Sequence, residues 1–197
     1  MTRNDVIPND VIPNDVIPEN MTDYSVSPDD MVLTARGLRF QGRLYPCTIG
    51  RGGLSRTKRE GDGATPVGIH HVVGMFYRAD RMPRPAHWAE PTGLRDLWSD
   101  DSRAPEYNQL VRAPYGASHE TMRRADPLYD LVMITDWNYP EAEPERGSCI
   151  FIHRWRRKGF PTAGCLGLRP DHLLQIAARI EPGARFVVPP IAPLLRD

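Results

Sequence analysis

From Met31 onward the chain is a succession of short apolar runs separated by turn residues, and this pattern restricts the fold more than any other feature. Runs of this length, bounded by turn residues, are typical of β-strands. Most of the 20 prolines fall between the runs, which favours long loops ordered by local stiffness. We therefore predict a mainly β domain with a few short helices. The runs are MVLTA, LRFQG, RLYPCTIG, GIHHVVGMFY, LYDLVMITDW and SCIFIH.

One amphipathic helix is predicted in the segment RPDHLLQIAARIEPG. Pro170 suits a first helical turn, and Pro182 with Gly183 would end the helix. A last strand, ARFVVPP, would close the domain. The side chains expected on one apolar stripe of the helix are Leu173, Leu174, Ile176, Ala177 and Ile180.

The first 30 residues differ in character from the rest. Residues 4–18 read NDVIP three times over, a repeat that is too short and too rich in proline to bury a face. We predict a disordered tail over residues 1–30 and a single folded domain over residues 31–197.

Charge is unevenly distributed along the chain, although the formal net charge is zero. Residues 1–30 carry seven acids and one base, so residues 31–197 hold 24 bases and 18 acids. Arginine supplies 23 of the 25 basic residues, and an arginine-rich surface favours carboxylate or phosphate partners. No recognition motif or aromatic-interleaved basic stripe indicates a nucleic-acid partner.

Three cysteines, Cys47, Cys149 and Cys165, cannot all pair within one chain, and their wide spacing matches no zinc-ligand pattern. At least one thiol is expected to be free. The sequence has no run of about 18 apolar residues and no basic-then-apolar secretory signal, so we expect no membrane span.

The stretch SCIFIHRWRRKGFPTAGCLGL places a histidine at the end of an apolar run and a cysteine after a short basic turn. Alternation along the run puts Cys149, Phe151 and His153 on one strand face. A chain that leaves this strand and returns can bring His153 and Cys165 within hydrogen-bonding distance. The alternative is purely structural, because free cysteines are commonly buried as small hydrophobic residues.

If the two side chains meet, they form a nucleophilic pair. His153 would take the thiol proton, and a Cys165 thiolate beside an imidazolium would have a lowered pKa. Gly164 permits a tight turn, so that main-chain N–H groups near Gly164 and Cys165 could face a developing oxyanion. This chemistry requires no metal or other cofactor.

Three motifs carry a resemblance to a known family. GRGGLSRTKREGDGATPVG, LYDLVMITDWNY and GSCIFIHRWRRKGFPTAGCLGL resemble the YkuD-type L,D-transpeptidases of bacterial peptidoglycan, from about Met31 to Pro190. The glycine-rich first motif lacks the GK[ST] ending of a phosphate loop. The last motif matches the family at the four residues His153, Thr162, Gly164 and Cys165.

The resemblance implies a YkuD-like β-sandwich or mixed sheet and a Cys165 thioester formed from a peptidoglycan stem peptide. An amine of a second stem peptide would resolve the thioester as a 3-3 cross-link, or as a 1-3 cross-link if the donor bond is cut nearer the L-alanine. Muropeptides are then the expected partners, and the cell envelope or periplasm the expected location. Because no signal segment is visible, a cytoplasmic location stays open, as does the oligomeric state.

Four residues are candidates for substrate binding. Arg154 and Trp155 follow the histidine, and Arg154 would clamp a stem-peptide carboxylate. Asn138 and Tyr139 end a predicted strand, where such groups often line a pocket, although ordinary turn chemistry explains Asn138 equally well. A solvated basic hairpin is the structural alternative for the arginine.

The sequence departs from the family at three points near the pair. Ala163 replaces a frequent histidine, Gly167 replaces an asparagine or arginine, and the spacing from His153 to Cys165 is short. We expect a backbone carbonyl to orient the imidazole, because the neighbouring Arg154 cannot accept a hydrogen bond. The segment from about Ala79 to Arg124 is either a lid or a long ordered loop.

Two other functions stay open at this point. An L,D-carboxypeptidase would resolve the same thioester with water and trim stem peptides during recycling. A non-catalytic wall-binding module would keep the fold without the chemistry, and the intact His-Thr-Gly-Cys set argues against it.

Overall fold

The structure is a computed structural model that describes residues 25–191 and Leu194. Most of the predicted tail, residues 1–24, lies outside the described residues. The prediction of a mainly β domain with little helix is confirmed. The elements are β1 (Met31–Thr34), β2 (Gly37–Phe40), β3 (Arg43–Tyr45), β4 (Cys47–Thr48), β5 (Leu54–Ser55), β6 (Thr65–Pro66), β7 (Gly68–Tyr77), β8 (Glu90–Pro91), β9 (Asp96–Ser99), β10 (Leu110–Arg112), β11 (His119–Thr121), the 3-10 helix η3 (Pro127–Tyr129), β12 (Leu131–Thr135), β13 (Phe151–Arg154), β14 (Leu166–Leu168), α1 (Pro170–Ala177) and β15 (Arg185–Val188).

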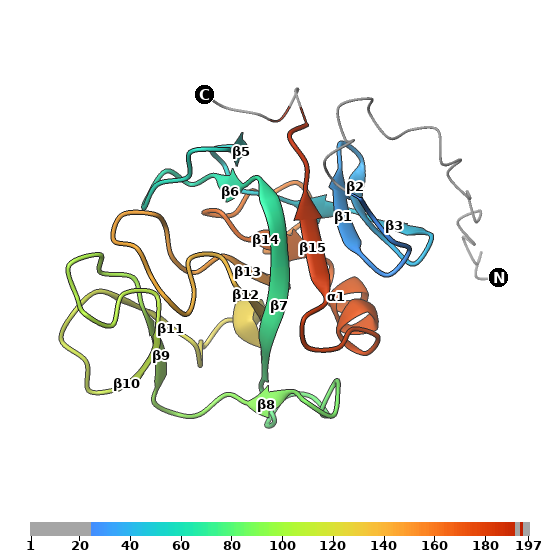
Figure 1. The fold of residues 1–197 in the computed structure, drawn as a ribbon. Coiled ribbons are helices and arrows are strands. Elements are labelled where there is room, and N and C mark those ends of the chain that lie inside the picture. Colours follow the sequence, from blue (N-terminus) through green and yellow to red (C-terminus); the bar gives the residue numbers. More distant parts are fainter. Residues whose placement is uncertain (1–24, 192–193, 195–197) are drawn as a thin grey trace.

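A ten-stranded mixed sheet forms most of the domain, in the order β3-β2-β1-β15-β7-β12-β13-β14-β4, with β8 paired to β7. The long strand β7 runs between β15 and β12 (Figure 1). The two end strands, β3 and β4, are separated in sequence only by Pro46, so the sheet nearly closes on itself.

Side-chain alternation along the strands divides the interior into two hydrophobic cores. In β12, Met133 enters the larger core, which α1 and the β1–β2 strands also fill, whereas Val132 and Ile134 enter the smaller one. In β13, Ile152 faces the larger core and Phe151 the smaller one. This period of two is what a strand buried on both faces requires.

A second sheet of three strands, in the order β10-β9-β11, covers the smaller core. It lies on the opposite side of the molecule from β1, β2 and β3 (Figure 1). Trp98 of β9 meets the Phe151 ring edge-on at 5.1 Å between centroids and donates its indole N–H to Asn108 Oδ1 at 2.9 Å. The segment left open as a lid or loop thus contains a small sheet packed against the main one.

Residues just before Met31 make hydrogen bonds with the strand-rich part of the chain. Asp30 is buried and accepts a hydrogen bond from the Arg185 guanidinium at 3.1 Å, and the Gln41 amide donates to the Pro28 carbonyl at 3.0 Å. Pro28 and Asp30 are thus hydrogen-bonded to Gln41, between β2 and β3, and to Arg185 of β15, and the boundary at Met31 stays a prediction.

The helix begins at Pro170 as predicted, but it ends at Ala177, well before Pro182. Leu173, Ile176 and Ala177 are buried in the larger core, whereas Leu174 is 40% exposed and was wrongly placed on the apolar stripe. An eight-residue helix covers little surface, and the face that meets the sheet is narrower than the sequence pattern suggests.

The contact between the two sheets gives a stability prediction. Replacing Trp98 by Ala should lower the free energy of unfolding by about 3–5 kcal/mol, because it removes the largest side chain of the smaller core. Urea unfolding followed by fluorescence and circular dichroism measures the loss. Leu94→Ala is the matched control, since Leu94 lies in the same segment and is 84% exposed. Equal stability of the two variants would contradict the packing described here.

Candidate active site

Two adjacent parallel strands bring His153 and Cys165 to the same region. In the ladder between β13 and β14, Ile152 pairs with Leu166 and His153 pairs with Gly167. Cys165 directly precedes β14, so alternation places its side chain on the same face as those of Phe151 and His153. Cys165 packs in the smaller core with Phe151, and both Cys165 and His153 line one cavity of about 520 Å³.

Charged side chains from two other parts of the chain complete this cavity. The glycine-rich segment between β4 and β6 contributes Arg51, Lys58 and Glu60. The segment around the small sheet contributes Asp100, Glu120 and Arg124. The cavity therefore presents groups of both charges around the two candidate catalytic side chains.

Cys165 carries a neutral thiol in this setting. Its sulfur donates a hydrogen bond to the Cys149 carbonyl at 3.0 Å, and its side chain is buried. Burial raises the pKa of the thiol to about 12, and the nearby charge of Glu120 acts in the same direction. Cys149, which supplies the carbonyl, has a positive φ of 54° just before β13.

His153 is neutral as well. Its Nδ1 lies 2.7 Å from the Arg154 carbonyl, which only accepts, so Nδ1 carries the hydrogen and Nε2 is the free base. The expectation of a backbone carbonyl as the orienting group is confirmed. Burial lowers the pKa of the imidazole to about 4, and the Tyr129 ring packs edge-on against it at 5.2 Å.

The expected thiolate–imidazolium pair is therefore not the resting state. Both pKa values are shifted toward the neutral forms, mainly by burial. Burial disfavours the charged form of each group, because a charge loses its hydration there. Among residues 25–191 and Leu194, no group of three His, Cys, Asp or Glu side chains is placed to hold a metal ion.

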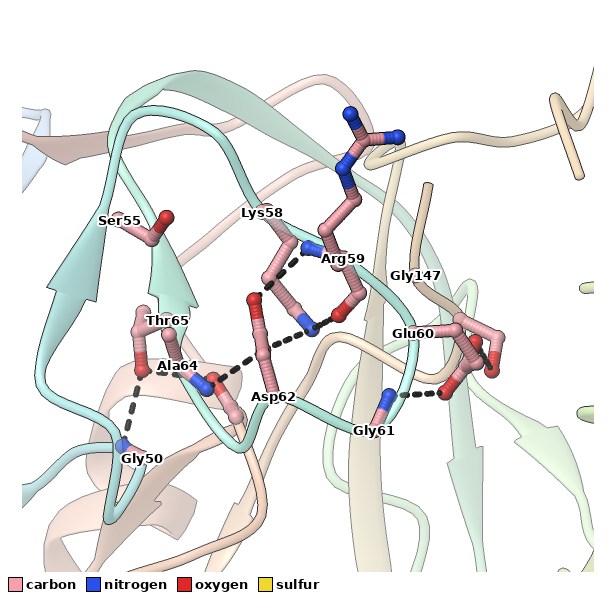
Figure 2. A network of polar contacts seen from close by, with 12 residues as sticks. Gly50, Ser55, Lys58, Arg59, Glu60, Gly61, Asp62, Ala64, Thr65 and Gly147 are labelled. Carbon is pink, nitrogen blue, oxygen red and sulfur yellow. Dashed lines mark hydrogen bonds and ion pairs between the residues drawn. The ribbon is translucent and has the colours of Figure 1, made fainter. Parts of the chain in front are cut away.

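Thr162 and Gly164 shape the turn in front of the nucleophile. Thr162 Oγ1 donates to the Cys165 carbonyl at 2.6 Å and accepts from the Gly164 N–H at 3.2 Å. The Gly164 N–H expected to face an oxyanion is thus engaged at rest. The Gly164 carbonyl accepts from Thr65 Oγ1 at 2.7 Å. Thr65 Oγ1 in turn accepts from the Gly50 N–H at 2.9 Å (Figure 2).

The predicted substrate-binding residues are placed in different surroundings. Trp155 lines the cavity, but Arg154, Asn138 and Tyr139 are not among its lining residues. The Asn138 amide donates to the carbonyls of Glu143 and Gly147 and accepts from the Glu143 N–H, so it organises its own loop.

Tyr139 packs against Trp98 at 5.4 Å in the smaller core. A substrate-binding role for Arg154 stays a prediction, and the basic side chain of the same loop that does line the cavity is Arg156.

Sequence reasoning gave no role to several charged residues of the cavity. Lys58 and Glu60 stand in the glycine-rich motif, and charged residues embedded in such a loop were the available signal. Glu120 and Arg124 had no such signal, because nothing in the local sequence shows that their segment packs against the pair.

A comparison with protein families settles the class of the domain. The model of the YkuD L,D-transpeptidase catalytic domain matches residues 26–188. The chain belongs to the YkuD family of L,D-transpeptidase catalytic domains. The YkuD family is cysteine-dependent, acts on peptidoglycan peptides and is typically associated with the cell wall. Searches of curated proteins and of solved structures found no match to this chain.

Packing explains Gly167, one of the departures from the YkuD family pattern. A Cβ added at Gly167 would lie 2.5 Å from Thr48 Oγ1 and 3.2 Å from Trp155 Cβ. The space that a longer side chain needs is already filled by these two residues.

Within the described residues, none of the helices is long and apolar enough to cross a membrane.

The Gly164 turn gives the prediction for this site. Gly164 has a φ of +143°, and an added Cβ would lie 3.0 Å from the Ala64 carbonyl oxygen. Gly164→Ala should cost on the order of 1–3 kcal/mol of unfolding free energy, because both backbone and neighbour are strained. Chemical denaturation measures the cost. Gly116→Ala is the control, since its added Cβ meets no atom within 4 Å; a Gly164→Ala variant as stable as this control would refute the described turn.

Proposed function

We propose that this protein is a peptidoglycan L,D-transpeptidase that joins two stem peptides through a thioester on Cys165. The observation that carries the proposal is the meeting of Cys165 and His153 at one cavity, from adjacent parallel strands, with both groups neutral and buried. Membership in a family that acts on peptidoglycan peptides supports the choice of substrate.

Acylation begins with a proton transfer between two neutral groups. The Cys165 S–H, held at rest by the Cys149 carbonyl, turns to Nε2 of His153. The imidazole takes the proton as the sulfur attacks the carbonyl carbon of the donor peptide bond. The imidazolium then gives this proton to the leaving amine, so that the terminal D-amino acid departs and a thioester remains.

The thioester keeps the acyl group activated for a second transfer. An amine of another stem peptide attacks the thioester, His153 takes a proton from that amine, and the thiol of Cys165 is regenerated. The product is a 3-3 cross-link, or a 1-3 cross-link if the donor bond lies nearer the L-alanine. Water in place of the amine would make the enzyme an L,D-carboxypeptidase.

The charges of the cavity favour the transfer reaction. Arg51 and Arg156 suit the carboxylates of a donor stem peptide, because guanidinium groups bind carboxylates through two parallel hydrogen bonds. The acidic side chains Glu60 and Glu120 suit an incoming amine. Transfer requires such an amine, whereas hydrolysis does not.

The proposal is tested by incubating the protein with a purified disaccharide tetrapeptide. Intact mass should show an acyl adduct on wild type and on Cys47→Ala, and not on Cys165→Ala. The adduct is the donor without its terminal D-alanine for 3-3 transfer, and the donor cut after L-alanine for 1-3 transfer. Cys47 is the control because it is a free thiol that does not line the active-site cavity.

Chromatography of the products should show cross-linked dimers, whose fragmentation assigns the bond as 3-3 or 1-3. Trimmed monomers without dimers would establish the carboxypeptidase instead. An adduct that survives the loss of Cys165 would reject the assignment of the nucleophile.

A further inference from the structure

Lys58 is a buried cation at the wall of the active-site cavity. Four lysine or arginine side chains line this cavity, and they differ in exposure. Arg51 and Arg156 are exposed and Arg124 is half-buried, whereas Lys58 is only 6% exposed. A buried charge interacts with its neighbours through a medium of low dielectric constant and is screened little by salt.

The ammonium group of Lys58 is held in a fixed position. Its Nζ donates to Asp62 Oδ1 at 2.6 Å and to the Arg59 carbonyl at 2.5 Å. Asp62 also accepts from the N–H groups of Arg59, at 2.7 Å, and Ala64, at 2.8 Å (Figure 2). Although partial burial opposes it, these hydrogen bonds hold the pKa of Asp62 below its usual value. Asp62 is thus a fixed counter-ion that anchors the Lys58 ammonium group.

The side chain of Lys58 lies against the segment that holds the nucleophile. A Cβ added at Gly147 would be 3.2 Å from Cγ, Cε and Nζ of Lys58, and only glycine suits its φ of +103°. Two residues later, the Cys149 carbonyl accepts the Cys165 thiol. Glu60 ties the same loop to this segment, because it accepts from Ser148 Oγ at 2.8 Å.

The acidic and neutral ionisable groups around the nucleophile do not stabilise a negative sulfur. Glu60, Asp100 and Glu120 line the cavity and oppose it. Tyr129 is buried and Cys149 is partly buried, and desolvation keeps both neutral by raising the pKa of each.

Among the bases, Lys58 and Arg124 each pair with an aspartate, but the side chain of Lys58 is 3% exposed and that of Arg124 is 26% exposed, and Arg51 and Arg156 are exposed to screening. The proton that leaves Cys165 makes His153 cationic. The buried imidazole of His153 carries this charge only while the sulfur attacks. Lys58 is therefore the permanent buried cation of this cavity.

We propose that Lys58 is a positioning residue for the nucleophile: its ammonium, anchored by Asp62 against the Gly147–Cys149 segment, stabilises the negative charge on Cys165 while the sulfur attacks. Glu120 acts in the opposite sense from the other side of the cavity. The identity of the attacked carbonyl rests on the proposed function, but the effect on the sulfur can be measured without any substrate.

The test is the rate at which iodoacetamide alkylates Cys165 between pH 7 and 9.5, followed by site-resolved mass spectrometry. In this reaction the thiolate displaces iodide and the thiol proton goes to solvent. Lys58→Met should be alkylated about tenfold more slowly at each pH, which corresponds to a rise of about one unit in the thiol pKa. Lys58→Arg keeps the charge and should stay within about threefold of wild type. Glu120→Gln should be alkylated faster than wild type.

A Lys58→Met profile that overlays wild type in a folded protein would overturn the proposal. Thermal unfolding checks the fold, and Lys58→Gln, which keeps a hydrogen-bond donor, replaces the methionine variant if that one does not fold. A slowed alkylation in a protein that forms no acyl-enzyme with a muropeptide would retain the role of Lys58 and remove the proposed function. Normal alkylation of Lys58→Gln in a protein that does form the acyl-enzyme would remove the role of Lys58 and retain the proposed function.

Discussion

Burial of Cys165 and His153 is the constraint on which the site depends. The parallel pairing of β13 with β14 places both side chains on the strand face that meets the smaller core, where both are buried although they line the cavity. Neither group can hold a charge there without support, so each rests neutral against a backbone carbonyl, Cys149 for the thiol and Arg154 for the imidazole. Charge has to appear only during attack, and the surroundings determine how costly that is.

Those surroundings are assembled from parts of the chain that are far apart in sequence. The glycine-rich loop comes so close to the Gly-Cys turn that a Cβ at Gly50 would lie 3.0 Å from the Gly164 Cα, and Thr65 joins the two by hydrogen bonds. From the other side, the small sheet contributes Glu120, which accepts from the Tyr129 hydroxyl at 3.2 Å. The nearly closed main sheet holds these loops at one end of a single cavity.

Local sequence pattern predicted the parts of this arrangement that local pattern controls. The run Gly68–Tyr77 is a strand with the predicted bounds, and Pro170 begins the helix, because alternation and proline geometry are local properties. A motif predicted a pair of His153 with Cys165; in the structure both line one cavity, and each is hydrogen-bonded to a backbone carbonyl. The neutral state of the pair could not be read in the same way, since it follows from burial by a segment whose packing depends on Trp98 and Phe151 together. Sequence reasoning gave Lys58 and Glu120 no role for the same reason.

The measurement that tests the neutral pair most directly is the pH dependence of acylation in a single turnover, with thioester formation on Cys165 followed by intact mass. The pKa of His153 is lowered to about 4, so its imidazole is a competent base at every pH above that value, and the pKa of the thiol is raised to about 12, so the thiol keeps its proton up to that value. The acylation rate should therefore be level between pH 5.5 and 9. A rate that rises with a midpoint between pH 6 and 8.5 would show that a charged form has to be prepared first, and would contradict the account.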